Sequence, residues 1–463
     1  MRQHHRQSLA RRAHAGIGRA LPEIWLCAAQ RLRDGRAPPR SGPLRSLPRA
    51  PAILRAGQKR HRDLRPAAHS WYHQRGTPGD TRLKLALVHD WLNQIGGAED
   101  VLEALARQYP ESPIYTSIYA PQTMPKHYRD WEIRTLWTDK LPAIQRRHQM
   151  YLPLYPLAWR GLRLSDYDVV LSNKSGFCHG VQFDARALHI CYCLAPTRYV
   201  WQLDHYLAGE ELTPATKALL KPIIALIRRW DYAAAQRVSQ FVAISSAIRA
   251  RIRRYYNREA EVIFPPVDTA RFQPAPLDAV EDYYLIVSRL APYKRIDLAV
   301  QAANELGFAL KIAGSGRDLE RLQALAGESV EFLGYVPDSE LPRLMARCKA
   351  LLFPGLEDFG IAPVQAQAAG RPVIAFKGGG ALDTVVPTVT GEFFDDATLG
   401  SLMSVWRRFD AGAYDPESIR RHALRFDTAV FRERICAYVE QAWLAHQART
   451  PFQFQDPLVK VES

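Results

Sequence analysis

The sequence predicts an α/β protein made of two Rossmann-like, doubly wound domains that face each other across a cleft. Short apolar runs alternate with helical patterns from residue 84 to about 397, which is typical of parallel sheets covered by helices. A proline-rich stretch, VIFPPVDTARFQPAP, interrupts this alternation near its middle. The length of 463 residues and the apolar fraction of 47% are enough for two or three domains with a large core.

The first domain is predicted to span residues 83–272. KLALVHD (84–90) reads as its first strand, and GGAEDVLEALARQYP then gives a glycine turn and an amphipathic helix. Further strands are expected at 113–119, 168–173, 189–194 and 240–245. A long helical pattern covers 212–238, with a cap near Thr213, and Ser245 or Ser246 is a good N-cap for AIRARIRRYYN.

The second domain is predicted to span 273–447, with a tail at 448–463. Strands are expected at 283–290, 308–314, 329–334, 351–355 and 372–376, and helices at 294–306, 316–326 and 361–370. A further helix, DSELPRLMARC, should take Asp338 as its cap. The segment from about 397 to 447 is helical in pattern and is expected to pack back on the first domain.

Residues 1–82 are predicted to be a disordered basic extension. Residues 1–80 hold 16 Arg and one Lys against four acidic residues, a net charge of +13, which leaves only +2 for the rest of the chain. Eight prolines and no sustained periodicity argue against a core there. A nucleic-acid or lipid-binding arm and a transit-like peptide are alternatives. We favour a non-native upstream extension, so that truncation near residue 82 should keep activity and solubility.

The remaining composition limits the classes of function. No run of 18 uncharged apolar residues occurs, so no spanning helix is expected. Cys191 and Cys193 should point to one face of a strand, but no Cys-x-x-Cys pair or His cluster accompanies them, so no metal site is predicted. Reduced thiols in a cytoplasmic enzyme are the simplest account.

The most informative stretch is LLFPGLEDFGIAPVQAQAAGRPVIAFKGGG (351–380). It reads as strand, loop with Glu357, helix with Pro363 in its first turn, strand, and the glycine loop Gly378–Gly380. A helix N-terminus beside glycine loops offers free N–H groups to an anion, and a loop carboxylate can accept hydrogen bonds from hydroxyl groups. This combination indicates a nucleotide-sugar site.

Two other loops offer groups for a phosphate. Arg289 and Lys294 lie between a predicted strand and helix, where cations are unfavourable near a helix N-terminus unless an anion binds. Each charge-assisted bond to a diphosphate contributes about 1.5–3 kcal/mol. The loop Gly314-Ser315-Gly316 is expected beside the nucleotide. A dinucleotide fingerprint would need glycine at position 319, which is Leu319, so NAD binding is not predicted.

Residues 84–445 resemble glycosyltransferase family 4, the retaining transferases with two Rossmann-like domains (GT-B type). The family signature is a Glu, seven residues and a second Glu, in a context like EDFGI-x-PVEAQA-x-G-x-PVIA; here these positions are Glu357 and Gln365. SRL-x-x-x-KR matches at 288–295, GG-x-E at 96–99, and RY-x-W at 198–201. The resemblance implies catalytic roles for Arg289, Lys294 and Glu357. It also implies donor contacts from Gly96, Gly97, Gly314, Ser315, Gly316, Phe359, Gly360, Ile361, Gln365, Gly378, Gly379 and Gly380.

The chain departs from the family pattern at several positions. Family histidines that line the cleft are replaced by Ser175 and Leu194, with His179 nearby but shifted, and Ile244 stands where the family usually has Asn. Gln365 replaces the Glu that accepts bonds from ribose. A neutral amide oxygen still accepts, so the bond should weaken by about 1 kcal/mol.

The resemblance implies a cytoplasmic or peripheral-membrane hexosyltransferase that needs no metal or cofactor. Its closest likeness is to mannosyltransferases of surface-polysaccharide assembly, which suggests GDP-mannose as donor and a glycan or lipid-linked glycan as acceptor. Alternatives are a nucleotide-binding scaffold with impaired catalysis, a nucleotide-sugar epimerase of the same architecture, and a nucleic-acid binder acting through residues 1–80.

Overall fold

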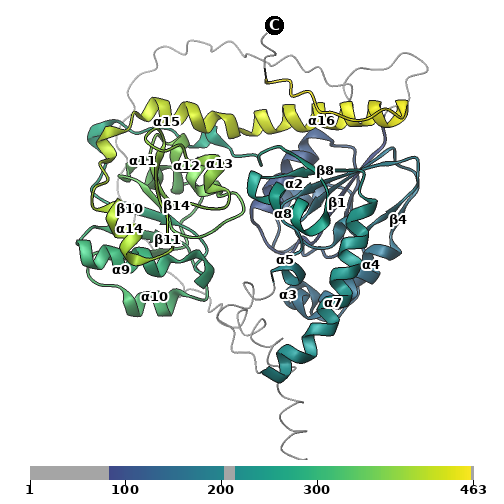
Figure 1. Cartoon of the computed structure of the whole chain (residues 1–463), viewed down its shortest axis with the longest axis horizontal. Coiled ribbons are helices and arrows are strands. Elements are labelled where there is room, and N and C mark those ends of the chain that lie inside the picture. Colours follow the sequence, from purple (N-terminus) through teal and green to yellow (C-terminus); the bar gives the residue numbers. More distant parts are fainter. Residues whose placement is uncertain (1–82, 203–213, 460–463) are drawn as a thin grey trace, which may run out of the picture.

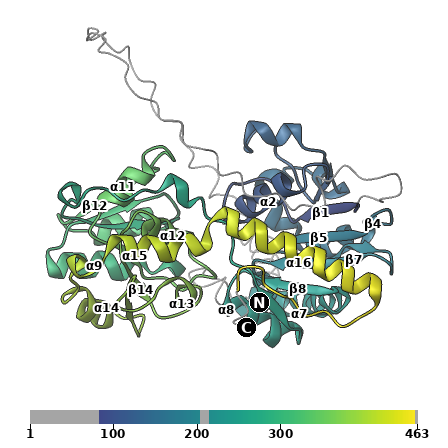
Figure 2. The same cartoon turned by 90° about the horizontal axis from the view of Figure 1, so that it is seen from above.

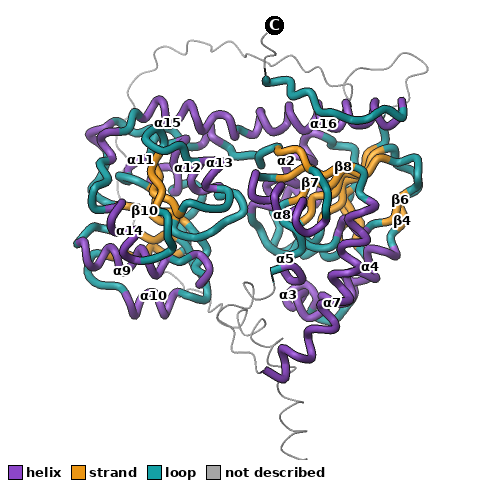
Figure 3. The backbone as a smooth tube through the Cα atoms, viewed as in Figure 1, coloured by secondary structure: helices purple, strands orange, loops and turns teal. Residues whose placement is uncertain are grey.

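The computed structural model describes residues 83–202 and 214–459 as two α/β domains side by side (Figure 1). The predicted basic extension at 1–82 lies outside the described residues, as do the expected cap Thr213 and the end of the tail. Each described domain has a parallel sheet with helices on both faces (Figure 3). The predicted fold class is therefore confirmed.

The first domain contains a seven-stranded sheet in the order β3-β2-β1-β5-β7-β8-β9. Its strands are β1 (Leu85–His89), β2 (Ile114–Thr116), β3 (Ile133–Thr135), β5 (Val169–Lys174), β7 (Leu188–Cys193), β8 (Gln240–Ala243) and β9 (Ala260–Val262), with the small pair β4 (Arg163–Leu164) and β6 (Gln182–Phe183) beside it. Its helices are α2 (Gly97–Gln108), α3 (Ile144–Arg147), α4 (Tyr155–Gly161), α5 (Arg198–Trp201), α7 (Pro214–Arg237) and α8 (Ser246–Tyr256).

The second domain contains a six-stranded sheet in the order β12-β11-β10-β13-β14-β15. The strands are β10 (Tyr284–Val287), β11 (Leu310–Ala313), β12 (Val330–Gly334), β13 (Leu351–Phe353), β14 (Val373–Phe376) and β15 (Gly391–Phe394). The helices are α9 (Ile296–Leu306), α10 (Leu319–Leu325), α11 (Leu341–Arg347), α12 (Ile361–Ala368), α13 (Ala381–Thr384), α14 (Leu399–Trp406), α15 (Pro416–Ala423) and α16 (Thr428–Ala448).

The strand order in both sheets reverses beside the first strand of each domain. In the first domain the reversal lies between the neighbouring strands β1 and β5, and in the second domain it lies between β10 and β13. In doubly wound sheets, ligands bind beyond the carboxyl ends of the strands at this switch point. The loops after β10 and β13 are therefore where a ligand of the second domain is expected.

Local sequence signals explain some of the helix starts. The Ser245 hydroxyl accepts a hydrogen bond from the Ile248 N–H at 3.1 Å and caps α8 as predicted. Pro363 lies in the first turn of α12, also as predicted. The prediction of Asp338 as the cap of α11 is wrong, because a turn at Pro337 comes first. The Pro337 carbonyl accepts from the Glu340 and Leu341 N–H groups, and Glu340 occupies the cap position.

The C-terminal helix α16 crosses from the second domain to the first (Figures 1 and 2). Its Phe431 ring packs edge-on against Tyr192 of β7, with ring centroids 5.6 Å apart. Arg434 donates a hydrogen bond to the Val262 carbonyl at 3.1 Å. The expectation that the segment from about 397 to 447 packs back on the first domain is confirmed for α16 only, because α14 and α15 pack against the second domain.

The chain crosses between the domains twice, and the two crossings are hydrogen bonded to each other. Val267 in the linker after β9 donates its N–H to the Phe426 carbonyl at 3.0 Å. Its own carbonyl accepts from the Thr428 N–H at 3.1 Å, at the start of α16. The proline-rich linker and the return segment therefore form one short paired unit at the domain boundary.

Candidate active site

The structure brings Lys294 and Glu357 together at the switch point of the second domain. Lys294 lies in the loop after β10, Glu357 lies in the loop after β13, and their charged groups form an ion pair. Both side chains are largely but not fully buried, with 13% and 21% of their surface exposed. The two residues are 63 positions apart in the sequence, and no sequence pattern predicted that they form an ion pair.

A glycine allows the two loops to approach this closely. A Cβ placed on Gly355 would lie 2.8 Å from both the Cα and the carbonyl oxygen of Lys294. Backbone atoms cannot move aside as the end of a flexible side chain can, so a larger residue at position 355 would push the loops apart. Glycine at the end of LLFPG is therefore needed for the pair.

The glycine loop Gly378–Gly380 holds the backbone of the Glu357 loop in place. The Gly380 N–H donates to the Glu357 carbonyl at 2.9 Å, and a Cβ on Gly380 would lie 2.2 Å from the Phe359 Cα. A Cβ on Gly314 would likewise lie 1.9 Å from the Ser288 carbonyl oxygen. These glycines hold the strand-end loops against one another. Their predicted approach to a bound donor stays a prediction.

Arg289, Ser315 and Gly316 are exposed members of the predicted donor residues in the loops after β10 and β11. Arg289 is exposed, and its guanidinium donates to the Tyr293 hydroxyl at 3.0 Å rather than to Glu357. Ser315 is exposed between Gly314 and Gly316. A cation, hydroxyl and backbone N–H groups at one sheet edge suit a diphosphate.

Phe359 differs from the simple expectation of a donor contact. Its ring is buried and packs against Phe264 of the linker and Phe426, with centroid distances of 5.9 and 5.8 Å. The ring of Phe359 therefore packs at the domain boundary, and contact of this residue with a donor stays a prediction. Gly360 adopts a left-handed φ of +94° and leads directly into α12, where Gln365 is half-buried.

The first domain faces this edge through its glycine turn. A Cβ on Gly97, the first residue of α2, would lie 2.9 Å from Cδ1 of Ile361 in the second domain. The turn at Gly96 and Gly97 therefore lies at the domain boundary. Contact of either glycine with a donor stays a prediction.

Asp90, which sequence reasoning did not single out, organises the switch point of the first domain. Its carboxylate accepts hydrogen bonds from four consecutive backbone N–H groups, those of Ser175, Gly176, Phe177 and Cys178, at 2.6–2.8 Å. The one sequence feature that could have indicated this role is that Asp90 directly follows the first strand, β1. Asp90 fixes the loop after β5 in which Ser175 replaces the family histidine.

His179 does not substitute for a missing cleft histidine, because it is fully buried beside Asp231. Asp231 also accepts hydrogen bonds from Trp201 Nε1 at 2.7 Å and from the Tyr256 hydroxyl at 2.8 Å. Burial and the nearby Lys174 ammonium hold the pKa of His179 well below its usual range. His179 is thus a neutral member of a buried polar cluster.

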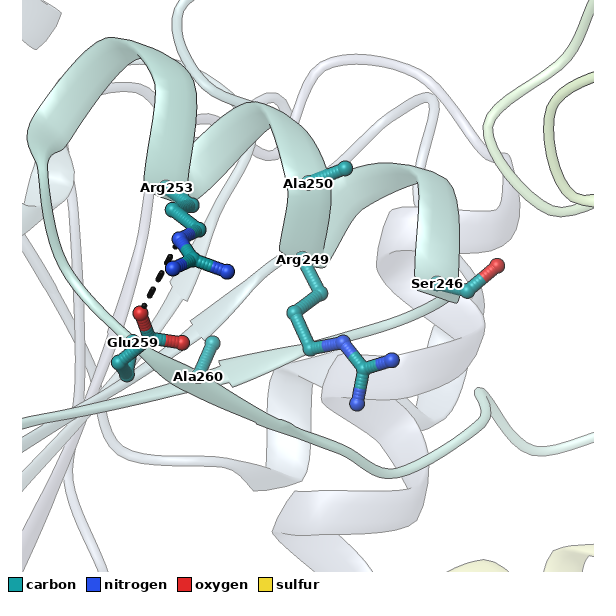
Figure 4. A pocket seen from close by; sticks show the side chains of 6 residues that line it. All are labelled: Ser246, Arg249, Ala250, Arg253, Glu259 and Ala260. Atoms are coloured by element: carbon teal, nitrogen blue, oxygen red, sulfur yellow. Dashed lines mark ion pairs between the residues drawn. The ribbon is translucent and has the colours of Figure 1, made fainter.

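An open hollow of about 420 Å³ lies elsewhere, against α8 (Figure 4). The figure shows Arg249 and Arg253 on one side of the helix, with Arg253 paired to Glu259 at 3.3 Å. Its lining is Ser246, Arg249, Ala250, Arg253, Glu259 and Ala260. None of the predicted donor residues contributes to it, so this hollow is separate from the candidate site.

Two kinds of feature are absent from residues 83–202 and 214–459. Within them, no three His, Cys, Asp or Glu side chains gather in a way that could hold a metal ion. No helix in the described ranges combines the length and apolar character needed to cross a bilayer.

Two consecutive parts of the chain match known families. Residues 95–271 match the family described as Glycosyltransferase Family 4, and residues 268–402 match Glycosyl transferases group 1. The two matches meet at the linker and together run through both domains. They cover the turn at Gly96 as well as Lys294, Glu357 and the glycine loop.

Curated relatives include sugar transferases. The chain is 32% identical over 190 residues to a GDP-mannose-dependent alpha-(1-6)-phosphatidylinositol monomannoside mannosyltransferase of Mycolicibacterium smegmatis, covering 34% of this chain and 50% of the relative. It is 26% identical over 348 residues to an alpha-1,3/1,6-mannosyltransferase of Mus musculus, covering 64% of this chain and 80% of the relative. The chain thus spans about half the length of the first of these relatives.

Solved structures support the fold. A sucrose-phosphate synthase from Thermosynechococcus elongatus matches with a TM-score of 0.60 at 19% identity, covering 79% of this chain and 100% of the other. HepE of Anabaena in complex with UDP matches with a TM-score of 0.56 at 18% identity, covering 77% and 100%. At this identity the likeness establishes the GT-B arrangement of the two domains.

Proposed function

Because the chain belongs to glycosyltransferase family 4, we propose that it transfers a hexosyl group from a nucleotide diphosphate sugar to a hydroxyl of a glycan or lipid-linked glycan, with retention of configuration. The observation that carries this proposal is the Lys294–Glu357 pair at the switch point of the second domain, with Arg289 exposed at the same edge. Cations there suit the diphosphate, and the carboxylate suits sugar hydroxyl groups.

In the proposed reaction the acceptor oxygen attacks the anomeric carbon on the face from which the diphosphate leaves. The bond from that carbon to the phosphate oxygen breaks, and this oxygen takes the acceptor proton. Arg289 and Lys294 stabilise the charge that develops on the diphosphate, as preorganised groups do in a water-excluded site. Since protein cations fill this role, transfer is expected to continue in the presence of EDTA.

We propose GDP-mannose as donor on the support of the mycobacterial relative, whose name specifies GDP-mannose. Calorimetric titration of the full chain with GDP, UDP, ADP and dTDP tests this choice. Clear preference for GDP, followed by mannosyl transfer to a lipid-linked acceptor, is the expected result. If only UDP binds, the donor is a UDP-sugar rather than GDP-mannose. Nucleotide binding without sugar transfer would favour the nucleotide-binding scaffold.

The scaffold is the second candidate, and the substitutions at Ser175, Leu194, Ile244 and Gln365 favour it. Gln365 can be tested directly. Gln365→Glu is expected to raise GDP affinity by up to about tenfold, because a carboxylate accepts hydrogen bonds from ribose more strongly than an amide. Calorimetry with GDP measures this change. A large loss of affinity would mean that Gln365 does not face the ribose.

We also propose peripheral contact with the cytoplasmic face of a membrane, where a lipid-linked acceptor would lie. Exposed apolar side chains occur on α4 and α7 and exposed basic side chains on α3, α4 and α7, helices that group at one end of the first domain (Figure 1). Leu157 and Leu226 are 62% and 70% exposed, and Arg146, Arg147, Arg160 and Arg229 are exposed nearby in the sequence. Such a surface suits anionic lipid.

Vesicle co-sedimentation tests this contact. The chain is expected to bind vesicles with 30% or so of anionic lipid and to lose most of that binding in Arg146→Glu/Arg147→Glu, since each basic residue contributes about 1 kcal/mol. Arg407→Glu/Arg408→Glu, exposed on the second domain, is the matched control. Equal loss in both variants would place the contact elsewhere.

A further inference from the structure

Asp358, the residue directly after Glu357, joins the donor loop of the second domain to the first domain. Its two carboxylate oxygens form ion pairs with different arginines: Oδ2 with Arg198 at the start of α5, and Oδ1 with Arg251 on α8. Asp358 is only 11% exposed and Arg251 only 18%. We refer to Arg198, Arg251 and Asp358 as the interdomain clamp.

The electrostatics of the interdomain clamp keep it charged. Burial alone would raise the pKa of Asp358, but Arg198 and Arg251 outweigh burial and hold that pKa below its usual value. Asp358 is in turn the main cause that raises the pKa of Arg198, and Tyr293 beside Arg289 acts in the same direction. Arg198 therefore reaches across the boundary to the same strand-end edge as the candidate site.

Two other contacts join the two domains. Asp383 on α13 accepts a hydrogen bond from the Ser246 N–H at 2.9 Å, at the N-terminus of α8 in the other domain. Ile361, three residues after Asp358, lies against Gly97. The segment from Glu357 to Ile361 is thus held by the first domain at two points as well as by its own glycine loop.

We propose that Arg198 and Arg251 are positioning residues, which place Glu357 for sugar transfer by holding Asp358 when the domains are closed. This inference rests on the proposed function and extends it, because it makes the donor site depend on both domains. When the domains separate, Asp358 loses both partners, and the adjacent Glu357 is then positioned only by the second domain. A group misplaced by about 1 Å can cost about 100-fold in rate.

The test compares Asp358→Asn and Arg251→Ala with wild type in the full chain. Asp358→Asn keeps the shape of the side chain but removes the charge that both arginines bind. Hydrogen–deuterium exchange in the absence of ligand should become faster in residues 356–362, and also at 245–248, where the Ser246 N–H donates across the boundary. The kcat with GDP-mannose should fall by about 100-fold, while the Kd for GDP stays nearly unchanged.

Arg249→Ala is the matched control. This variant also removes an arginine side chain from α8. Because Arg249 is two residues before Arg251, its side chain points to a different side of the helix. Arg249 lines the separate hollow shown in Figure 4 and should leave both exchange and kcat unchanged. Arg251→Lys retains the charge without the planar fork and should recover part of the lost kcat.

The two proposals can fail separately. If exchange at 356–362 and kcat in Arg251→Ala and Asp358→Asn equal those of Arg249→Ala, the clamp does not position Glu357, and that outcome overturns this inference alone. If no nucleotide sugar supports transfer by the wild type, the proposed function fails, while the exchange experiment still decides whether the clamp holds the donor loop. Unchanged exchange in the core strands β10–β15 would show that the variants remain folded.

Discussion

Replacing Glu357 by glutamine is expected to reduce kcat for sugar transfer by about 100- to 1,000-fold, the range seen when one preorganised electrostatic contact is lost at a reacting centre. The substitution removes a charge and leaves the volume nearly unchanged. It also leaves the Lys294 ammonium without its partner at the switch point. Steady-state kinetics of sugar transfer, with thermal unfolding to confirm the fold, provides the measurement. Lys294→Ala should cause a comparable loss.

Asp395→Asn is the matched control for Glu357→Gln. Asp395 forms an ion pair with Lys377 at 2.8 Å in the same domain, but their side chains are 72% and 55% exposed. An exposed pair of this kind contributes little to structure, so its loss should not affect transfer. Wild-type turnover in Glu357→Gln would remove Glu357 from the active site, whatever the control shows.

Asp231→Asn is expected to destabilise the chain by about 3–5 kcal/mol, the cost of breaking a buried charged network by removing one partner. Asp231 is fully buried and accepts hydrogen bonds from Thr197, Trp201 and Tyr256. Burial opposes the charge on Lys174, but Tyr256 and Asp231 outweigh it and hold the pKa of Lys174 well above its usual value. An asparagine would leave that buried ammonium uncompensated.

Urea unfolding followed by tryptophan fluorescence measures this change in the free energy of unfolding. Asp184→Asn removes a carboxylate from the surface of the same domain, where it pairs with Arg163 at 3.3 Å, and should change stability by less than about 1 kcal/mol. Equal effects of the two substitutions would show that the network around Asp231 does not stabilise the first domain.

Much of this architecture could be read from local patterns because parallel strands buried on both faces are apolar runs that differ clearly from the helices between them. KLALVHD became β1, YYLIVSRL contained β10, and the proline-rich stretch marked the boundary. The failure at α11 has a local cause. Asp338 is a good capping residue by type, but the turn at Pro337 delays the helix to Leu341.

The candidate site was predictable as a set of positions but not as a set of contacts. Glu357 and Lys294 were chosen from separate motifs, and only the fold shows that they pair. Asp358 and Arg198 lie in the matched motifs EDFGI and RY-x-W, but no local pattern showed that they meet, because the two partners of Asp358 lie 160 and 107 positions earlier in the chain. Contacts between domains depend on how two surfaces meet, and periodicity within one element holds no information about that.

The paired crossings at Val267 and Phe426 have a mechanical consequence. A single connection would allow the domains to rotate and translate in many directions. Two connections that are hydrogen bonded to each other should act as a hinge, so that the main motion is rotation about one axis. Residues beside the paired crossings, such as Phe264 and Phe426, whose ring centroids lie 5.0 Å apart, should therefore move least when the domains change their relative position. Cutting the chain before α16 would break one of the two connections, and the domain motion would no longer be restricted to rotation about one axis.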